Sequence, residues 1–87
     1  MTTLIDVLRE LKRQGDIIPD ATPLAGYVQA EYMAEGLREQ GHIQASTMSV
    51  AGKLRHLRTL GQVDHNYFNS PCGYWRLTPG GGKEVER

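Results

Sequence analysis

The stretch Ser46–Thr78, STMSVAGKLRHLRTLGQVDHNYFNSPCGYWRLT, decides how this chain is expected to fold. A serine or threonine that can cap a helix opens it, and Gly61 ends the helical part. Three apolar residues at helical spacing form the core stripe of this predicted helix: Val50, Leu54 and Leu57. Two short alternating segments follow, 62–67 and 73–78, with a loop of turn residues between them. This order predicts a helix over about 46–60 that leads into a two-stranded β-hairpin.

The N-terminal half of the chain is expected to be mostly helical. Apolar residues at helical spacing predict a first helix that begins at Thr2 or Thr3 and ends near Gln14. A threonine followed by proline then starts a second helical region, 23–40. Two interior glycines weaken this region. One long helix and two shorter helices with a break near 28–30 are therefore both compatible with it.

At 87 residues the chain is long enough for one small domain. We expect an α+β fold that is mainly helical, with three helices, or four if 23–40 holds two, followed by the hairpin. The domain would cover residues 1–79. Residues 80–87 begin with three glycines and end in charged side chains, a composition typical of a disordered tail.

The composition excludes several classes of protein. No apolar run is long enough to span a bilayer, and the N-terminal residues carry too many charges for a signal peptide. The single cysteine, Cys72, excludes an internal disulfide and fits a reducing compartment, so a cytoplasmic protein is expected. The sequence has no phosphate-binding loop and no nucleophile–base pair, and its histidines and cysteine are spaced unlike a zinc site. We therefore expect no enzymatic activity, no cofactor and no metal.

The net charge is zero, but the charges are unevenly distributed along the chain. Residues 1–40 contain seven acidic and four basic side chains, whereas residues 41–79 contain four basic side chains and a single acidic one, Asp64. The four basic residues are Lys53, Arg55, Arg58 and Arg76. Such a dipolar domain can bind a polyanion with its basic half and leave the acidic half for a protein partner. The alternative interpretation is a solvated helix face that happens to be basic.

The outer side of the predicted helix 46–60 carries most of the candidate DNA-contacting residues. They are Ser46, Thr47, Met48, Ser49, Gly52, Lys53, Arg55 and His56. Hydroxyl groups hydrogen-bond to any base, methyl groups suit thymine, and Lys53, Arg55 and His56 suit phosphates or guanine. Gly52 would let another surface approach closely. It is equally compatible with a weak point in a surface helix, as Met48 is with partial burial in the core.

The predicted hairpin has two faces. Trp75 and Leu77 share one of them, where we expect them to pack the hairpin against the helices. Arg76 lies on the other face and is the best hairpin candidate for a phosphate contact, together with Asn66 at the start of the connecting loop. Phe68 in that loop would either stack on or wedge into DNA, or fold back onto the domain.

These residues resemble a winged helix-turn-helix domain of the kind found in small bacterial, archaeal and phage regulators. The family pattern is a helix with L..L...G, a short strand, a wing, and then G.W.LT followed by glycine. The matching residues are Leu54, Leu57, Gly61, Val63, Gly73, Trp75, Leu77, Thr78 and Gly80. Upstream, 32–37 resembles the helix before the turn, and 42–46 resembles the turn itself. The resemblance covers 31–80 and, with the first helix, nearly the whole chain.

The resemblance implies sequence-specific binding of double-stranded DNA, often as a homodimer, through the third helix and the wing, and with it the regulation of transcription. Two features depart from the family: the linker 15–30 is longer than its compact version needs, and the net charge is neutral, whereas strong DNA binders are basic. Winged helices also serve as protein-interaction or assembly modules without DNA binding, which is the alternative function. A third hypothesis is single-stranded nucleic acid stacked on Tyr67, Phe68 and Tyr74.

Overall fold

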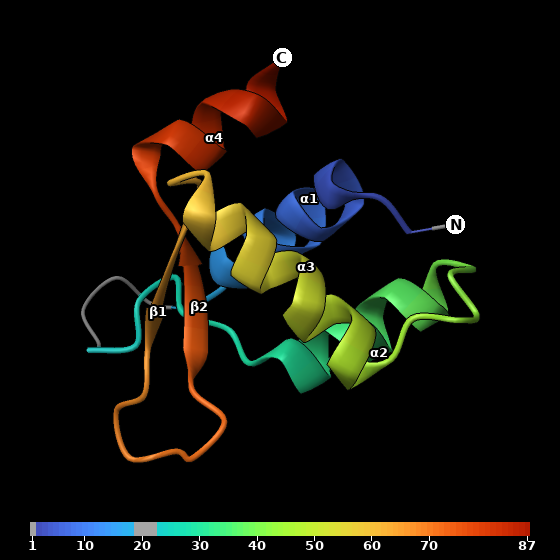
Figure 1. The fold of residues 1–87 in the computed structure, drawn as a ribbon, viewed down its shortest axis with the longest axis horizontal. Helices are drawn as coiled ribbons and strands as arrows, with labels where there is room; N and C mark the ends of the chain where they lie inside the picture. The colour runs from blue at the N-terminus through green and yellow to red at the C-terminus, as the bar shows by residue number, and fades with distance from the viewer. Residues whose placement is uncertain (1, 19–22) are drawn as a thin grey trace.

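The computed structural model of the chain describes residues 2–18 and 23–87, and Figure 1 shows how its elements are arranged. In chain order they are α1 (Leu4–Gly15), α2 (Ala30–Glu39), α3 (Thr47–Thr59), β1 (Val63–Asn66), β2 (Tyr74–Leu77) and α4 (Pro79–Glu86). The predicted mainly helical α+β layout, with three helices leading into a two-stranded antiparallel hairpin, is confirmed. A fourth helix is present, but it follows the hairpin. In the described part of the chain, no helix has the length and apolar character needed to cross a membrane.

The bounds of α1 agree closely with its sequence signals. Thr3 caps the helix, because its hydroxyl accepts a hydrogen bond from the Asp6 backbone N–H while the Asp6 carboxylate accepts one from the Thr3 N–H. Val7, Leu8 and Leu11 are almost completely buried on one side of the helix. This apolar side gives α2, α3 and β2 a common surface to pack against.

The predicted helical region 23–40 is helical only from Ala30 onward. The segment before it turns at Gly26, whose backbone is left-handed with φ +76°. Val28 then pairs with the hairpin: its N–H donates to the Trp75 carbonyl at 2.7 Å, and its carbonyl accepts from the Trp75 N–H at 2.8 Å. Backbone groups that bond sideways to a strand cannot also continue a helix, which explains the late start of α2. The predicted threonine cap of this region lies outside the described residues.

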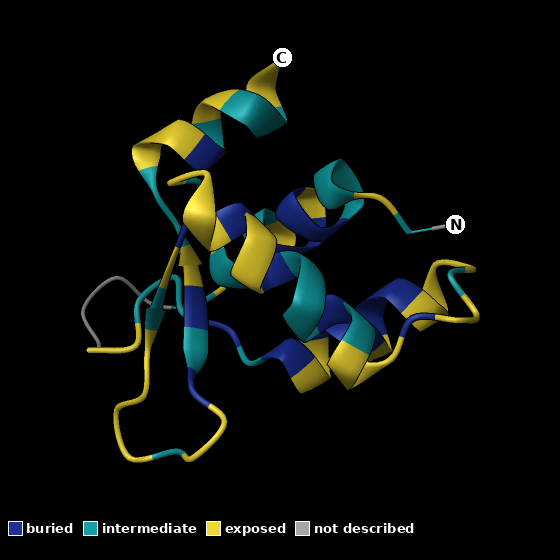
Figure 2. Cartoon of the chain, viewed as in Figure 1, coloured by how far each residue is buried: buried dark blue, intermediate teal, exposed yellow. Residues whose placement is uncertain are grey.

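α3 and the hairpin pack around the core stripe that the sequence predicts. The stripe is at most 1 % exposed at each of its three positions, Val50, Leu54 and Leu57. In the hairpin, Val63 lies opposite Leu77 and His65 lies opposite Trp75. Trp75 is buried in the same core, so its predicted packing role is confirmed. Figure 2 shows that the elements are buried where they face one another and exposed on their outer sides.

The C-terminal residues form α4 where a disordered tail over 80–87 was predicted. The Thr78 hydroxyl caps α4 by accepting a hydrogen bond from the Gly81 N–H at 3.1 Å, and proline occupies the first turn. Gly81 is buried against the Gln62 carbonyl, at a place where a Cβ would collide. Val85 packs on the core from the following turn. These contacts hold α4 against α1 and β2 although its glycines disfavour a helix, so the domain extends beyond residue 79.

Candidate nucleic-acid interface

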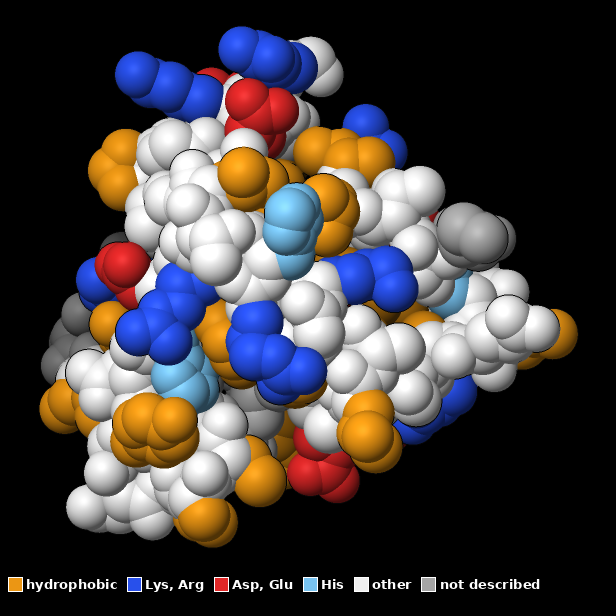
Figure 3. Space-filling view, viewed as in Figure 1, with side chains coloured by type: hydrophobic (Ala, Val, Ile, Leu, Met, Phe, Trp, Pro, Cys, Tyr) orange, Lys and Arg blue, Asp and Glu red, His pale blue; other side chains and the backbone are white. Residues whose placement is uncertain are grey.

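α3 has a hollow on either side of its exposed face. The hollow between α3 and the hairpin, here the hairpin groove, is lined mainly by Met48, Arg55, Arg58, His65, Tyr67 and Cys72. The hollow between α3, the α2–α3 turn and the start of α1, here the turn pocket, is lined mainly by Thr2, His42, Gln44, Ser49 and Lys53. Figure 3 shows Lys and Arg side chains gathered over α3 on this face of the molecule.

Basic side chains dominate the α3 wall of the hairpin groove. Arg55 and Arg58 follow Met48 at helical spacing, so that all three line the same side of the helix. Both arginines are exposed. Within residues 2–18 and 23–87, neither arginine forms an ion pair. None of the residues that line the groove is acidic, so the groove is positively charged at neutral pH.

The hairpin wall of the groove is built around His65. Its ring lies on Trp75, with 4.2 Å between ring centroids, and meets the Tyr67 ring edge-on at 4.5 Å. Its Nε2 atom lies 3.5 Å from the Cys72 carbonyl oxygen. Gly73 makes this position available, because the His65 ring occupies the place where a side chain at 73 would begin. The imidazole is therefore held at the floor of the groove by the shape of the hairpin.

Arg76, the predicted phosphate contact of the hairpin, lies on the opposite face from the groove. Because side chains alternate along a strand, it is directed away from the side on which Trp75 is buried. Its guanidinium carbon lies 4.5 Å from the centroid of the Tyr27 ring, and its nitrogen lies 3.7 Å from the Asp64 carboxylate. The structure therefore does not bring Arg76 together with the basic residues of α3.

The loop of the hairpin is folded back onto the domain. Phe68 contacts Tyr27 and Tyr74 edge-on, with centroid distances of 5.0 and 5.5 Å. This is the second of the two alternatives that the sequence left open for Phe68. The Asn66 side chain is used within the loop, where its carbonyl oxygen accepts a hydrogen bond from the Phe68 N–H at 3.1 Å. Tyr67, which is 60 % exposed, is the aromatic side chain that the loop turns toward the groove.

The start of α3 offers fewer free hydroxyl groups than its sequence suggests. The Ser46 hydroxyl accepts a hydrogen bond from the Ser49 N–H at 3.1 Å, and the Ser49 hydroxyl accepts one from the Ser46 N–H at 3.0 Å. Both serines thus form the helix cap. Thr47 is exposed, and Met48 is 84 % exposed, so burial of Met48 in the core is excluded.

Gly52 and His56 lie one turn apart on the ridge of α3 that separates the two hollows. His56 is exposed and Gly52 is half-buried. A guanidinium nitrogen of Arg55 lies 3.8 Å from the place that a Cβ of Gly52 would take. Arg55 therefore partly covers the surface above Gly52. Lys53 lies on the other side of the ridge and lines the turn pocket.

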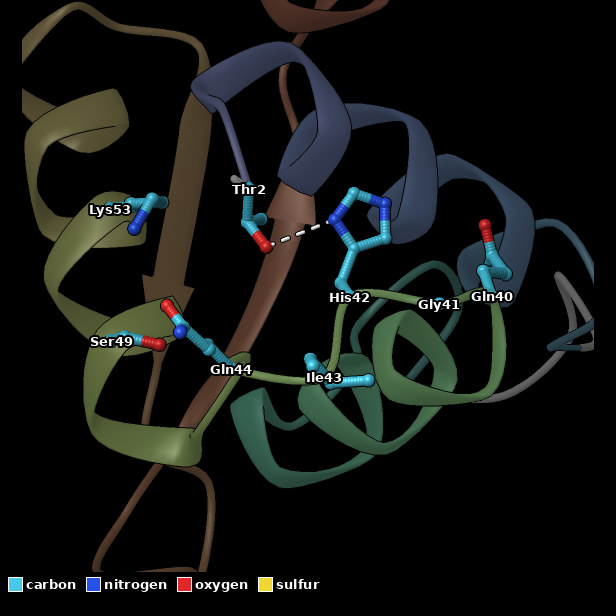
Figure 4. Close-up of a pocket in the computed structure, with 8 residues that line it drawn as sticks. All are labelled: Thr2, Gln40, Gly41, His42, Ile43, Gln44, Ser49 and Lys53. Carbon is cyan, nitrogen blue, oxygen red and sulfur yellow. Dashed lines mark hydrogen bonds between the residues drawn. The ribbon is translucent and has the colours of Figure 1, made fainter.

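The turn pocket brings polar side chains together from three segments. Figure 4 shows Lys53, Ser49 and the Gln44 amide on the α3 side, with Thr2 and His42 facing them. The Thr2 hydroxyl lies 3.0 Å from His42 Nδ1. The pocket is open to solvent and contains no acidic lining residue.

Three residues that line the hairpin groove were not among the predicted duplex contacts: Arg58, which was counted only as a basic residue, His65, and Tyr67, which was named only for stacking on single strands. Arg58 continues the stripe of Met48 and Arg55 by one more turn, so the same helical spacing could have found it. His65 is the strand partner of the buried Trp75, and alternation puts Tyr67, two residues further on, on the same side, where both line the groove beside α3.

Comparison with known proteins leaves the function to be inferred from these residues themselves. The chain matches no protein-family model, and no curated protein or solved structure is significantly similar to it. Within the described ranges 2–18 and 23–87, no three His, Cys, Asp or Glu side chains come together as metal ligands.

Proposed function

We propose that this domain binds double-stranded DNA by placing α3 in the major groove. The observation that supports it best is the charge on either side of α3. Arg55 and Arg58 line one flank and Lys53 lines the other, and neither hollow contains an acidic residue. In a chain with equal numbers of acidic and basic residues, this separation creates a local positive surface on which a polyanion can bind.

The dimensions of α3 and of B-DNA are compatible with this placement. An α-helix with its side chains is about 10–12 Å across, and the major groove is about 12 Å wide. The exposed ridge would meet the base edges with Thr47 and Met48 near the start of the helix and with His56 further along. The hairpin would lie beside one DNA backbone, with Arg58 and Tyr67 closest to it.

A single copy offers few contacts, and we therefore propose that the domain acts as a homodimer. Each neutralised phosphate contributes a slope of about −0.9 to the dependence of log affinity on log salt. Three cations on one α3 give modest affinity, whereas two copies on adjacent half-sites double the number of contacts. In this proposal the protein is a cytoplasmic regulator of transcription, with its acidic N-terminal half directed away from DNA.

The test is fluorescence polarisation with a labelled duplex of random sequence, measured between about 50 and 200 mM salt. Replacing Arg55 and Arg58 by alanine should weaken binding roughly tenfold to a hundredfold and reduce the magnitude of the salt slope by about two. The matched control replaces Arg9 and Lys83, exposed cations on α1 and α4, and should bind as the parent does. Equal affinity of the Arg55/Arg58 variant and the control would overturn the placement of α3.

An apolar hollow on the other face favours a second candidate, a protein-interaction module without DNA binding. Ile17, Leu24, Tyr27, Tyr32 and Tyr74 are among the side chains that line it, and apolar patches of this kind often mark protein contacts. This candidate predicts no duplex affinity even at low salt. Polarisation with a single strand tests the third hypothesis, which is weakened because Phe68 and Tyr74 already contact one another.

A further inference from the structure

We propose that the turn pocket is a second anion site, which takes a backbone phosphate from the DNA strand that the hairpin groove does not reach. This inference rests on the proposed function and deepens it. It assigns the role of phosphate contact to Lys53 and the Gln44 amide, with Thr2 and His42 forming the opposite wall of the pocket.

The first argument is the position of the pocket. Lys53 and Ser49 are one helical turn apart on α3, and both line the turn pocket, whereas Arg55 and Arg58 line the hairpin groove. A helix that fills a groove about 12 Å wide has one sugar–phosphate backbone on each flank. Basic groups on both flanks would therefore meet both strands, and the turn pocket lies where the second strand would pass.

The second argument is the chemistry of the lining. Eight residues line the pocket, and none of them is acidic. Lys53 is half-buried, and among residues 2–18 and 23–87 it has no carboxylate partner. A cation with no carboxylate partner is available to pair with a bound anion, and the absence of acidic side chains around it favours that anion electrostatically.

The third argument is which donors remain available. The Ser49 hydroxyl is used by the cap of α3, so it forms part of the wall and not a contact. Figure 4 shows the Gln44 amide, which belongs to the α2–α3 turn, beside Ser49 on the side of the pocket where Lys53 also lies. The first turn of α3 lies beside both groups, and its positive dipole end adds to their attraction for an anion. The Asp6 carboxylate, whose charge interacts with His42 on the opposite wall, accepts hydrogen bonds from the Thr3 N–H and hydroxyl.

The experiment compares Lys53→Ala and Lys53→Gln with the control Lys83→Ala, an exposed lysine on α4. With the random duplex, both Lys53 variants should bind roughly threefold to tenfold more weakly and have a salt slope smaller in magnitude by about 0.9. Their thermal melting should match that of the control. Combined with the Arg55/Arg58 replacements, the loss should be multiplicative, because the two flanks contact different strands.

Nuclear magnetic resonance separates the sources of the phosphate. The side-chain amide signal of Gln44 should shift when duplex is added and stay in place with inorganic phosphate alone. A saturable shift with inorganic phosphate would overturn the assignment to DNA and favour a free phosphate ligand. An unchanged salt slope in the Lys53 variants, with a reduced slope in the Arg55/Arg58 variant, would overturn the pocket and leave the proposed function standing. Absence of duplex binding by the parent protein would overturn both.

Discussion

The α1–α2 pair and the α3–hairpin pair use their charges in opposite ways. Between α1 and α2, the almost fully buried Glu10 carboxylate accepts hydrogen bonds from Arg13 Nε at 2.8 Å and from the Gln40 amide at 2.7 Å, and the Gln14 amide also donates to it. On α3 the two exposed arginines have no ion pair among the described residues. Charge in the first region binds helices to each other, whereas charge in the second is available to a partner.

This difference teaches that stability and binding should be separable by mutation. A buried ionic group that loses its partners leaves an uncompensated charge, so its replacement costs free energy of unfolding. An exposed cation without a partner contributes little to folding. Substitutions in the α1–α2 pair should therefore lower stability, and those on α3 should lower affinity.

The largest expected effect is that of Glu10→Gln. The amide would present N–H groups to Arg13, Gln14 and Gln40, all of which donate to the carboxylate in the native protein. The free energy of unfolding, measured by urea denaturation, should fall by about 2–4 kcal/mol. DNA affinity under conditions where the variant remains folded should be unchanged.

Glu35→Gln, at an exposed position of α2, is the matched control and should change stability by less than about 0.5 kcal/mol. If Glu10→Gln behaved as this control does, the buried carboxylate would not be what joins α1 to α2.

The next largest effect is expected for Gly73→Ala, which should lower both the folding stability and the affinity for DNA. Gly73 has φ +78°, and a Cβ there would displace the His65 ring from the groove. We expect a loss of about 1–3 kcal/mol in the free energy of unfolding together with weaker duplex binding. Gly82→Ala is the control, because Gly82 lies in α4 and a Cβ there would meet no other atom, so alanine should stabilise by up to about 1 kcal/mol. Unchanged duplex affinity in Gly73→Ala would show that His65 is not part of the interface.

The third prediction concerns the stability of the fold at acidic pH. Burial alone would raise the pKa of Glu10, but hydrogen bonds from Arg13, Gln14 and Gln40 outweigh it, so the pKa lies below its ordinary value. The stabilisation is complete above the pKa of the unfolded chain, about 4.3 for glutamate, and is lost as the pH falls through the lower pKa of the folded state. The melting temperature should therefore decrease below about pH 4 in the parent and decrease less in Glu10→Gln. Identical pH profiles for the two proteins would exclude Glu10 as the source.

The smallest effect is expected for Arg76→Ala. Arg76 is in the basic half of the chain, yet it lies over Tyr27 and near Asp64, and so resembles the charges of the α1–α2 pair. Its exposed contacts should contribute at most about 1 kcal/mol to folding. Duplex affinity should change by less than about threefold, which is below the effect expected for a lost phosphate contact. A tenfold loss of affinity would place the Arg76 face of the hairpin against DNA.

The fold was predictable where the local signals were complete. The apolar spacing of α3 and the alternation in the hairpin each identify one structure, and the cap of α1 is visible in its sequence. Val28 could not be placed in the same way, because its pairing with Trp75 depends on residues 47 positions apart in the chain. The glycines of α4 indicate disorder locally. The Gln62 carbonyl, which leaves no room for a Cβ at Gly81, comes close only in the folded chain and could not be read from the sequence.

The candidate site was predictable in part. Helical spacing places Lys53 and Arg55 outside the core stripe of α3. It does not say that they line different hollows, because that depends on where the hairpin and the start of α1 lie. Arg76 was assigned to the interface by its charge and by its place on the strand face opposite Trp75. The structure keeps it on that face, over Tyr27 and near Asp64, so its contact with a phosphate stays a prediction that is separate from the hairpin groove.

The position of Trp75 gives this protein an optical reporter. It is the single tryptophan of the chain, and its indole lies beneath the His65 ring at the floor of the hairpin groove while its backbone holds Val28. The fluorescence of Trp75 should thus change when the domain unfolds and also when a ligand binds in the hairpin groove. Unlabelled protein is then sufficient to follow unfolding and ligand titration in the same cuvette.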